Sequence, residues 1–130
     1  MDTKDDFYLP EEDIEWIGLK KSQYLSKLIQ LMKPNDFGFE EFHQFDGQVP
    51  QTIENPDKSY HDEDDGKEIR TYVRTYDKSG AYHQVVVGVV IADEKSKTEV
   101  YIPVLFFVTR DDEVVKAFST GEVMSRPILN

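Results

Sequence analysis

The second half of the chain contains three long runs of residues that favour β-strands. They lie at 69–76, 82–91 and 100–109, and the middle run is rich in valine. Charged or glycine-containing stretches separate the runs and are typical of hairpin turns. A fourth, shorter run at 114–119 predicts a last strand. We therefore expect a four-stranded antiparallel meander across residues 68–120.

Both faces of the middle strands would be apolar, because side chains alternate between the two faces of a strand. One helix covers only one face, so the other needs the aromatic segment 37–45 or a second copy of the protein. Pro103 predicts an edge position or a bulge, since proline cannot donate to the ladder. With tight hairpins, one face would hold Val85, Val87, Val89, Ile102, Val104, Phe106, Val108 and Val115, and the other Val86, Val90, Tyr101, Leu105, Phe107, Val114 and Phe118.

The first half predicts a helix over residues 10–33. Its apolar residues recur near helical spacing, Pro10 suits a first turn, and Pro34 ends the element. Gly18 lies inside this stretch and could break it into two shorter helices. The helix packed on the meander predicts an α+β fold, with an acidic loop at 46–67.

We expect residues 1–130 to form a single domain, with a loose acidic arm at 1–8 and a tail at 121–130. A helix before an antiparallel meander resembles, in outline, the cystatin-like and nuclear-transport-factor-like folds. That resemblance implies a pocket between the helix and a curved sheet.

The net negative charge comes entirely from the first half of the chain. Residues 1–68 hold eighteen acidic against seven basic residues, and residues 69–130 hold eight of each, so the first half supplies the whole net charge of −11. Such a charge repels nucleic acids and anionic lipids and favours a basic protein partner. The chain has no cysteine, its start is acidic, and no apolar run approaches a membrane span. We therefore expect a cytoplasmic protein.

One functional hypothesis is a non-catalytic, acidic protein-binding domain. It could be an immunity protein or antitoxin-type inhibitor that neutralises a basic, nucleic-acid-handling enzyme by charge complementarity. Aromatic side chains near the acidic segments would anchor the complex. The candidate partner-binding residues are Glu11, Glu12, Asp13, Glu15, Trp16, Glu40, Glu41, Phe42, Tyr60, Asp62, Glu63, Asp64 and Asp65.

Two alternatives belong to other classes of function. A small-ligand-binding or enzymatic domain would use a pocket lined by Tyr72, Arg74, Tyr76, His83 and Tyr101, with the arginine facing an anionic group. A dimeric adaptor domain would join two copies through the second apolar face of the sheet.

No catalytic residue, metal or cofactor is predicted. The histidines do not lie in a nucleophile motif, and there is no phosphate-binding loop. The run His61 to Asp65 does not follow the calcium-loop pattern. Counting Gly66 as the sixth position places Tyr72 twelfth, where a glutamate is needed.

Overall fold

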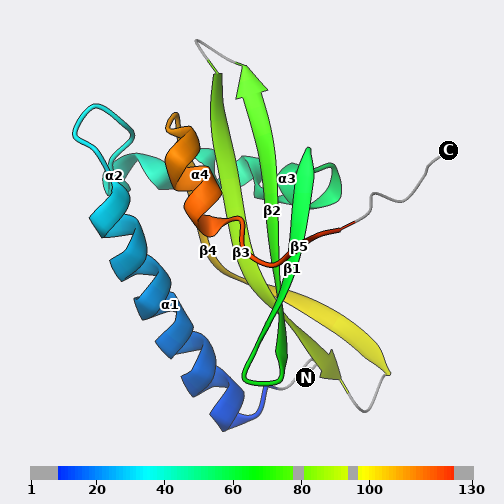
Figure 1. The fold of residues 1–130 in the computed structure, drawn as a ribbon. Coiled ribbons are helices and arrows are strands. Elements are labelled where there is room, and N and C mark those ends of the chain that lie inside the picture. The colour runs from blue at the N-terminus through cyan, green and yellow to red at the C-terminus, as the bar shows by residue number, and fades with distance from the viewer. Residues whose placement is uncertain (1–8, 78–80, 94–96, 125–130) are drawn as a thin grey trace, which may run out of the picture.

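The computed structural model describes residues 9–77, 81–93 and 97–124 and has an α+β fold. A long N-terminal helix packs on a five-stranded antiparallel sheet of order β4-β3-β2-β1-β5 (Figure 1). The helices are α1 (Glu11–Leu31), α2 (Phe39–Phe42), the 3-10 helix η1 (His43–Gln48), α3 (Val49–Glu54) and α4 (Asp112–Phe118). The strands are β1 (Lys58–Asp64), β2 (Lys67–Asp77), β3 (Ala81–Asp93), β4 (Thr98–Thr109) and β5 (Glu122–Val123). The predicted arm at 1–8 and the end of the tail lie outside the described residues.

The N-terminal helix is continuous, so Gly18 does not break it into two shorter helices. Gly18 is exposed, and a Cβ atom at that position would meet nothing within 4 Å. Pro10 precedes the first helical residue, and its carbonyl accepts the backbone N–H groups of Asp13 and Ile14. Three acidic residues in the first turn complement the positive end of the helix dipole. Leu28 is the residue that α1 buries most deeply.

The expected loop at 46–67 was wrong, because this stretch holds parts of four elements. The 3-10 helix continues to Gln48, α3 follows, β1 begins at Lys58 and β2 begins at Lys67. Asp65 and Gly66 join β1 to β2 with φ values of 56° and 76°. Two central residues with positive φ form the type I′ turn that Asp-Gly favours. β1 thus adds a strand, and with the short β5 the sheet has five strands instead of four.

A bulge in β4 changes which side chains face the helix. Leu105 pairs with Val87, but Pro103 pairs with Gly88, so one residue of β4 is extra. The one-residue shift moves every following side chain to the opposite face. Leu105 and Phe107 therefore join Val85 and Val87, whereas Phe106 and Val108 lie on the other face. The face assignment predicted for residues 105–108 was wrong for this reason, while the prediction for Pro103 is confirmed, both as a bulge and as an edge strand.

Residues 112–118 form a helix, α4, where the pattern predicted a strand. The side chain of Asp111 accepts the backbone N–H of Glu113 at 2.9 Å and caps the first turn. Val114 and Phe118 are four residues apart, share one side of the helix and are both buried.

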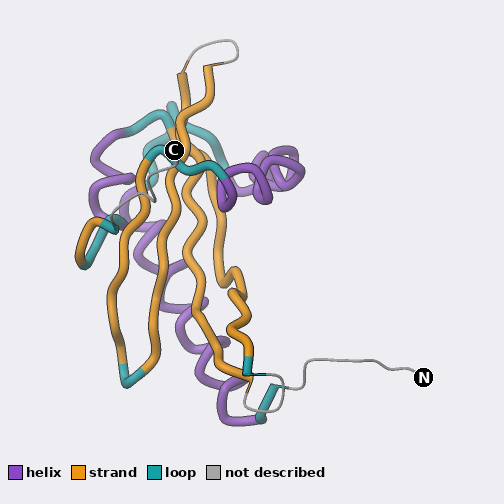
Figure 2. Tube along the Cα trace, turned by 90° about the vertical axis from the view of Figure 1, so that its right-hand side faces the viewer, coloured by secondary structure: helices purple, strands orange, loops and turns teal. Residues whose placement is uncertain are grey.

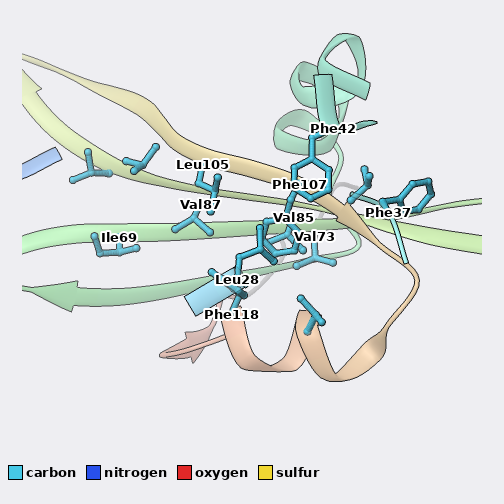
Figure 3. Close-up of a cluster of buried hydrophobic side chains, with 14 of the residues drawn as sticks. Leu28, Phe37, Phe42, Ile69, Val73, Val85, Val87, Leu105, Phe107 and Phe118 are labelled. Atoms are coloured by element: carbon cyan, nitrogen blue, oxygen red, sulfur yellow. The ribbon is translucent and has the colours of Figure 1, made fainter. Parts of the chain in front are cut away.

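The core lies between one face of the sheet and the pair α1 and α4. Leu28 from α1 and Phe118 from α4 meet Val73, Val85 and Val87 of the strands (Figure 3). Figure 2 shows α1 running along the strands behind the sheet in that view.

The aromatic segment supplies a second layer over part of the opposite face, as one of the two expectations proposed. Phe37 and Phe45 contact the ring of Tyr82, with centroids 5.7 and 5.2 Å away. Thr52 of α3 bonds Tyr76 and the buried Gln84 on the same face, at 2.8 and 2.5 Å.

Side chains of the sheet itself cover another part of that face. Tyr101 lies across Gly88, and its hydroxyl donates to the carbonyl of Arg70 at 3.0 Å. Tyr72 contacts the same ring edge-on, with centroids 5.2 Å apart. Val86 beneath them is fully buried.

Candidate functional site

Two acidic segments that are about fifty residues apart in the sequence meet at one end of the molecule. The β1–β2 hairpin lies beside the first turns of α1 (Figure 1). Lys20 of α1 pairs with Asp64 of β1, and Lys67 of β2 pairs with Asp13 of α1 at 3.7 Å. We call this surface the acidic end; it consists of Glu11, Glu12, Asp13, Glu15, Asp62, Glu63, Asp64 and Asp65.

Trp16 of α1 contacts lysines of both segments. The ammonium of Lys67 lies 5.2 Å from its ring centroid and that of Lys20 lies 5.8 Å away. Cation–π contacts of this kind are attractive by roughly 0.5–1 kcal/mol at partly exposed sites. Trp16 is half-buried and packs against the core. Its predicted role as a partner anchor stays untested, but its contacts already explain its position.

Most carboxylates of the acidic end have no ion-pair partner among the described residues. Asp13 and Asp64 are held by the two lysines, and Asp62 accepts the backbone N–H of Glu63 at 2.8 Å. The other five form no ion pair with any residue that the structure describes, and all are exposed. These five are Glu11, Glu12, Glu15, Glu63 and Asp65.

Not all of the predicted partner-binding residues belong to this surface. Glu40, Glu41 and Phe42 lie in α2, beyond the opposite end of α1, whose 21 residues span about 30 Å. Glu41 accepts the backbone N–H of Gly38 at 2.8 Å and starts that helix. Phe42 is buried near Phe107, so it cannot anchor a partner in the folded protein. The predicted set is therefore divided between two ends of the molecule.

A small cleft separates the acidic end from the core. It measures about 190 Å³ and lies between α1, β1 and α4. Burial, together with the charges of Asp64 and Asp62, raises the pKa of Tyr24 to about 12. Lys27 donates to the carbonyl of Ala117 at 2.5 Å, and burial lowers its pKa. The cleft is smaller than the usual volume of ligand sites, about 300–1,000 Å³.

A larger groove lies between α4 and the ends of β1, β2 and β3. It measures about 420 Å³, and we call it the His83 groove. Its lining residues are Asp57, Lys58, Tyr60, Val73, Thr75, His83, Asp112, Val115, Lys116 and Ser119. Tyr60, a predicted partner anchor, is half-buried in this groove and does not belong to the acidic end.

His83 links α4 to the hairpin of β2 and β3. Its Nδ1 lies 2.9 Å from the Thr75 hydroxyl, and its Nε2 lies 2.8 Å from a carboxylate oxygen of Asp112. Because a carboxylate only accepts, Nε2 carries a hydrogen, and Nδ1 of a neutral ring then accepts from Thr75. The same three groups occur in hydrolase triads, where the aspartate is buried. The Asp112 side chain is 88% exposed, so this contact lacks the buried aspartate of a triad. It connects α4 to the sheet.

The predicted ligand pocket does not form, because its residues lie on both faces of the sheet. His83 pairs with Thr75, and Tyr82 pairs with Tyr76. This register places His83 towards α4, whereas Tyr72, Arg74, Tyr76 and Tyr101 face the opposite way. A tight hairpin would have put His83 beside Arg74, and the observed pairing differs from it by one residue.

Arg74 is held locally on that second face. Its guanidinium donates to the carbonyl of Asn55 at 2.5 Å and lies 5.4 Å from the ring centroid of Tyr76. Tyr76 stacks on Tyr82, with centroids 5.7 Å apart, and bonds Thr52. These contacts tie α3 to the sheet and leave no shared cavity with His83.

In the part of the chain that the structure describes, three or more metal-ligating side chains do not gather anywhere. Within the same residues, no helix combines the length and apolar character that a membrane crossing requires.

Comparison with known proteins does not identify a relative. No protein-family model matches the chain, and neither a curated protein nor a solved structure matches it significantly.

Proposed function

We propose that this chain is a non-catalytic protein-binding domain whose acidic end recognises a basic surface on another protein. The observation that supports it is the convergence of α1 and the β1–β2 hairpin, which gathers five carboxylates without a described partner on one exposed surface. Compact folding brings these charges together at a cost in mutual repulsion. A basic partner would relieve that repulsion.

The mechanism begins with electrostatic steering. Complementary charges raise the rate of encounter and orient the partner before contact, and both effects weaken as salt screens the charges. A basic cleft that binds nucleic acid presents the complementary surface. Occupying such a cleft would inhibit the enzyme that owns it, in the manner of an immunity protein or antitoxin. The absence of cysteine and the acidic composition are consistent with a cytoplasmic site of action.

Some of these acidic residues also stabilise the local structure. The test must therefore compare variants of equal net charge. Acidic residues in a first helical turn stabilise the helix dipole, and Asp65 suits its type I′ turn. Glu15 and Glu63 have neither role. We therefore expect binding to depend on where the carboxylates lie as well as on how many there are.

The test is affinity capture from a lysate of the source organism, eluted with a salt gradient, using three forms of the protein. The wild type, with a net charge of −11, is compared with two variants that each have a net charge of −7. The first neutralises the acidic end with Glu12→Gln, Glu15→Gln, Glu63→Gln and Asp65→Asn. The control neutralises exposed carboxylates elsewhere with Glu40→Gln, Asp46→Asn, Glu54→Gln and Glu122→Gln.

We expect the wild type and the control variant to retain the same basic protein to the same salt concentration. The acidic-end variant should lose it at lower salt or fail to bind it. Equal retention by all three forms would show that the acidic end does not form the interface. Equal loss by both variants would show that only net charge matters.

A further inference from the structure

The His83 groove has the size and the apolar base of a small-molecule site. Its volume of about 420 Å³ falls within the usual range for such sites. Val73 is buried at the base, and Val115 of α4 and the half-buried Tyr60 of β1 form apolar walls. The contact between His83 and Asp112 holds α4 over the strands.

The acidic groups of the groove are already engaged. Asp57 accepts the backbone N–H of Thr75 at 2.7 Å. Asp112 accepts from the imidazole of His83 at 2.8 Å. Neither carboxylate therefore needs a ligand to satisfy it.

The two lysines of the groove form no ion pair with a described residue. Lys58 of β1 and Lys116 of α4 both line it, and no residue in the described part of the chain pairs with either ammonium. By contrast, Lys20, Lys33 and Lys67 each pair with a carboxylate. The two lysines and the two aspartates that line the groove balance in charge, but both aspartates already accept hydrogen bonds, so the ammonium groups are the charged groups that can still bind a ligand.

We propose that the His83 groove binds a small carboxylate with an apolar body. The apolar body lies against Val73 and Val115, and the carboxylate is held by the ammonium groups of Lys58 and Lys116. Because both lysines are exposed, their attraction is partly screened, and binding is weak and depends on salt. The groove shares no residue with the acidic end, so this site is independent of the proposed protein interface.

The test uses three probes that share one apolar body: 3-phenylpropionate, 3-phenyl-1-propanol and 3-phenylpropylamine. Each is titrated into the intact protein at matched ionic strength while backbone amide resonances are followed by NMR. For a probe of this size, we expect the carboxylate to bind with a dissociation constant of about 1–10 mM, and at least about tenfold more tightly than the amine. The shifted resonances should be those of Val73, Thr75, His83 and Val115.

Variants separate the groove from general attraction to lysine. Lys58→Gln combined with Lys116→Gln should weaken binding of 3-phenylpropionate at least about fivefold. Lys21→Gln combined with Lys97→Gln removes the same charge from exposed positions outside the groove and should leave binding within about twofold of wild type. All four positions are exposed, and the amide spectrum of each variant reports directly whether the fold is intact.

Three results would overturn the proposal. The first is the absence of groove shifts up to about 20 mM 3-phenylpropionate. The second is equal affinity for the carboxylate, the alcohol and the amine. The third is equal weakening by the two lysine pairs. None of these results would bear on protein capture by the acidic end, so the two proposals fail separately.

Discussion

Replacement of Gly88 by alanine should be among the most damaging single-methyl changes in this protein. A Cβ atom at Gly88 would lie 2.4 Å from Cζ of Tyr101 and 2.6 Å from its hydroxyl oxygen. It would also lie 2.6 Å from the backbone carbonyl oxygen of Ile102. Rotation of the tyrosine could relieve the first two contacts. The third involves the backbone of the paired strand at the β4 bulge, so the strands themselves must separate.

The magnitude follows from two contributions. Overpacking a filled site costs about 1–3 kcal/mol. Displacing Tyr101 also removes its hydrogen bond to the carbonyl of Arg70, which contributes about 1 kcal/mol. We therefore expect Gly88→Ala to lower the free energy of unfolding by about 2–4 kcal/mol.

The assay is denaturant unfolding followed by circular dichroism, with Gly18→Ala as the matched control. Gly18 lies in the exposed middle of α1, where a methyl group meets nothing, so its replacement should raise the free energy of unfolding by about 0.5–1 kcal/mol. In a Tyr101→Ser background, Gly88→Ala should cost less than in the wild type, because only the carbonyl contact remains. A Gly88→Ala protein as stable as wild type would refute the reasoning.

Three further predictions concern the core and the helix ends. Burial raises the pKa of Tyr24 to about 12 and also raises that of Tyr101, so the native state holds protons that the unfolded chain releases above about pH 10. The contribution of these two tyrosines to the free energy of unfolding should thus be constant up to about pH 9 and fall from there towards pH 12, with a smaller fall in Tyr24→Phe, as measured by urea titrations at each pH. Thr52→Val leaves the buried Gln84 carbonyl oxygen without its donor and should cost about 1–3 kcal/mol, whereas Thr52→Ser should cost less in the same unfolding assay. Asp111→Ala removes the cap of α4 and should lower the free energy of unfolding by about 1 kcal/mol, while Asp111→Ser keeps most of it; equal losses in both would exclude the cap as the cause.

Periodicity predicted the long elements of this fold correctly. The apolar spacing of residues 10–33 gave the first helix, and the valine-rich runs gave β2, β3 and β4. These segments are long, so many residues repeat the same period and local exceptions have little weight. Pro103 also indicated its own role, because the missing N–H permits few places in a sheet.

Register is what periodicity could not predict. A shift of one residue reverses every side chain, and the β2–β3 pairing and the β4 bulge each introduce such a shift. The first shift places His83 on the face opposite Arg74, so the residues of the predicted pocket do not come together. The second exchanged Phe106 and Phe107 between the faces.

Two short elements are marked by local sequence signals. Asp65-Gly66 between strand-like residues is a strong signal for a two-residue hairpin, and it marks the turn between β1 and β2. An aspartate before an acidic first turn, with Val114 and Phe118 four residues apart, is typical of a capped helix. In residues 46–67 the high charge masks the turn signal, and in residues 114–119 the β-branched residues mask the helical spacing.

The acidic end was only partly predictable for a different reason. Sequence composition identified every one of its carboxylates, but it could not separate them from Glu40 and Glu41, which lie in α2 beyond the far end of α1. The convergence depends on contacts between Lys20, Asp64 and Trp16 that span the helix and the hairpin. Such long-range contacts leave no local pattern.

The most direct test of the protein-binding proposal is the rate at which the captured basic protein associates with wild type and the two charge-matched variants. Stopped-flow measurements from about 0.02 to 0.3 M salt cover the range over which screening changes most. We expect the wild-type and control rate constants to be equal and to fall at least about tenfold across this range. The acidic-end variant should associate slowly at all salt concentrations. A wild-type rate that hardly depends on salt, or an acidic-end variant that associates as fast as the control, would contradict the proposed function.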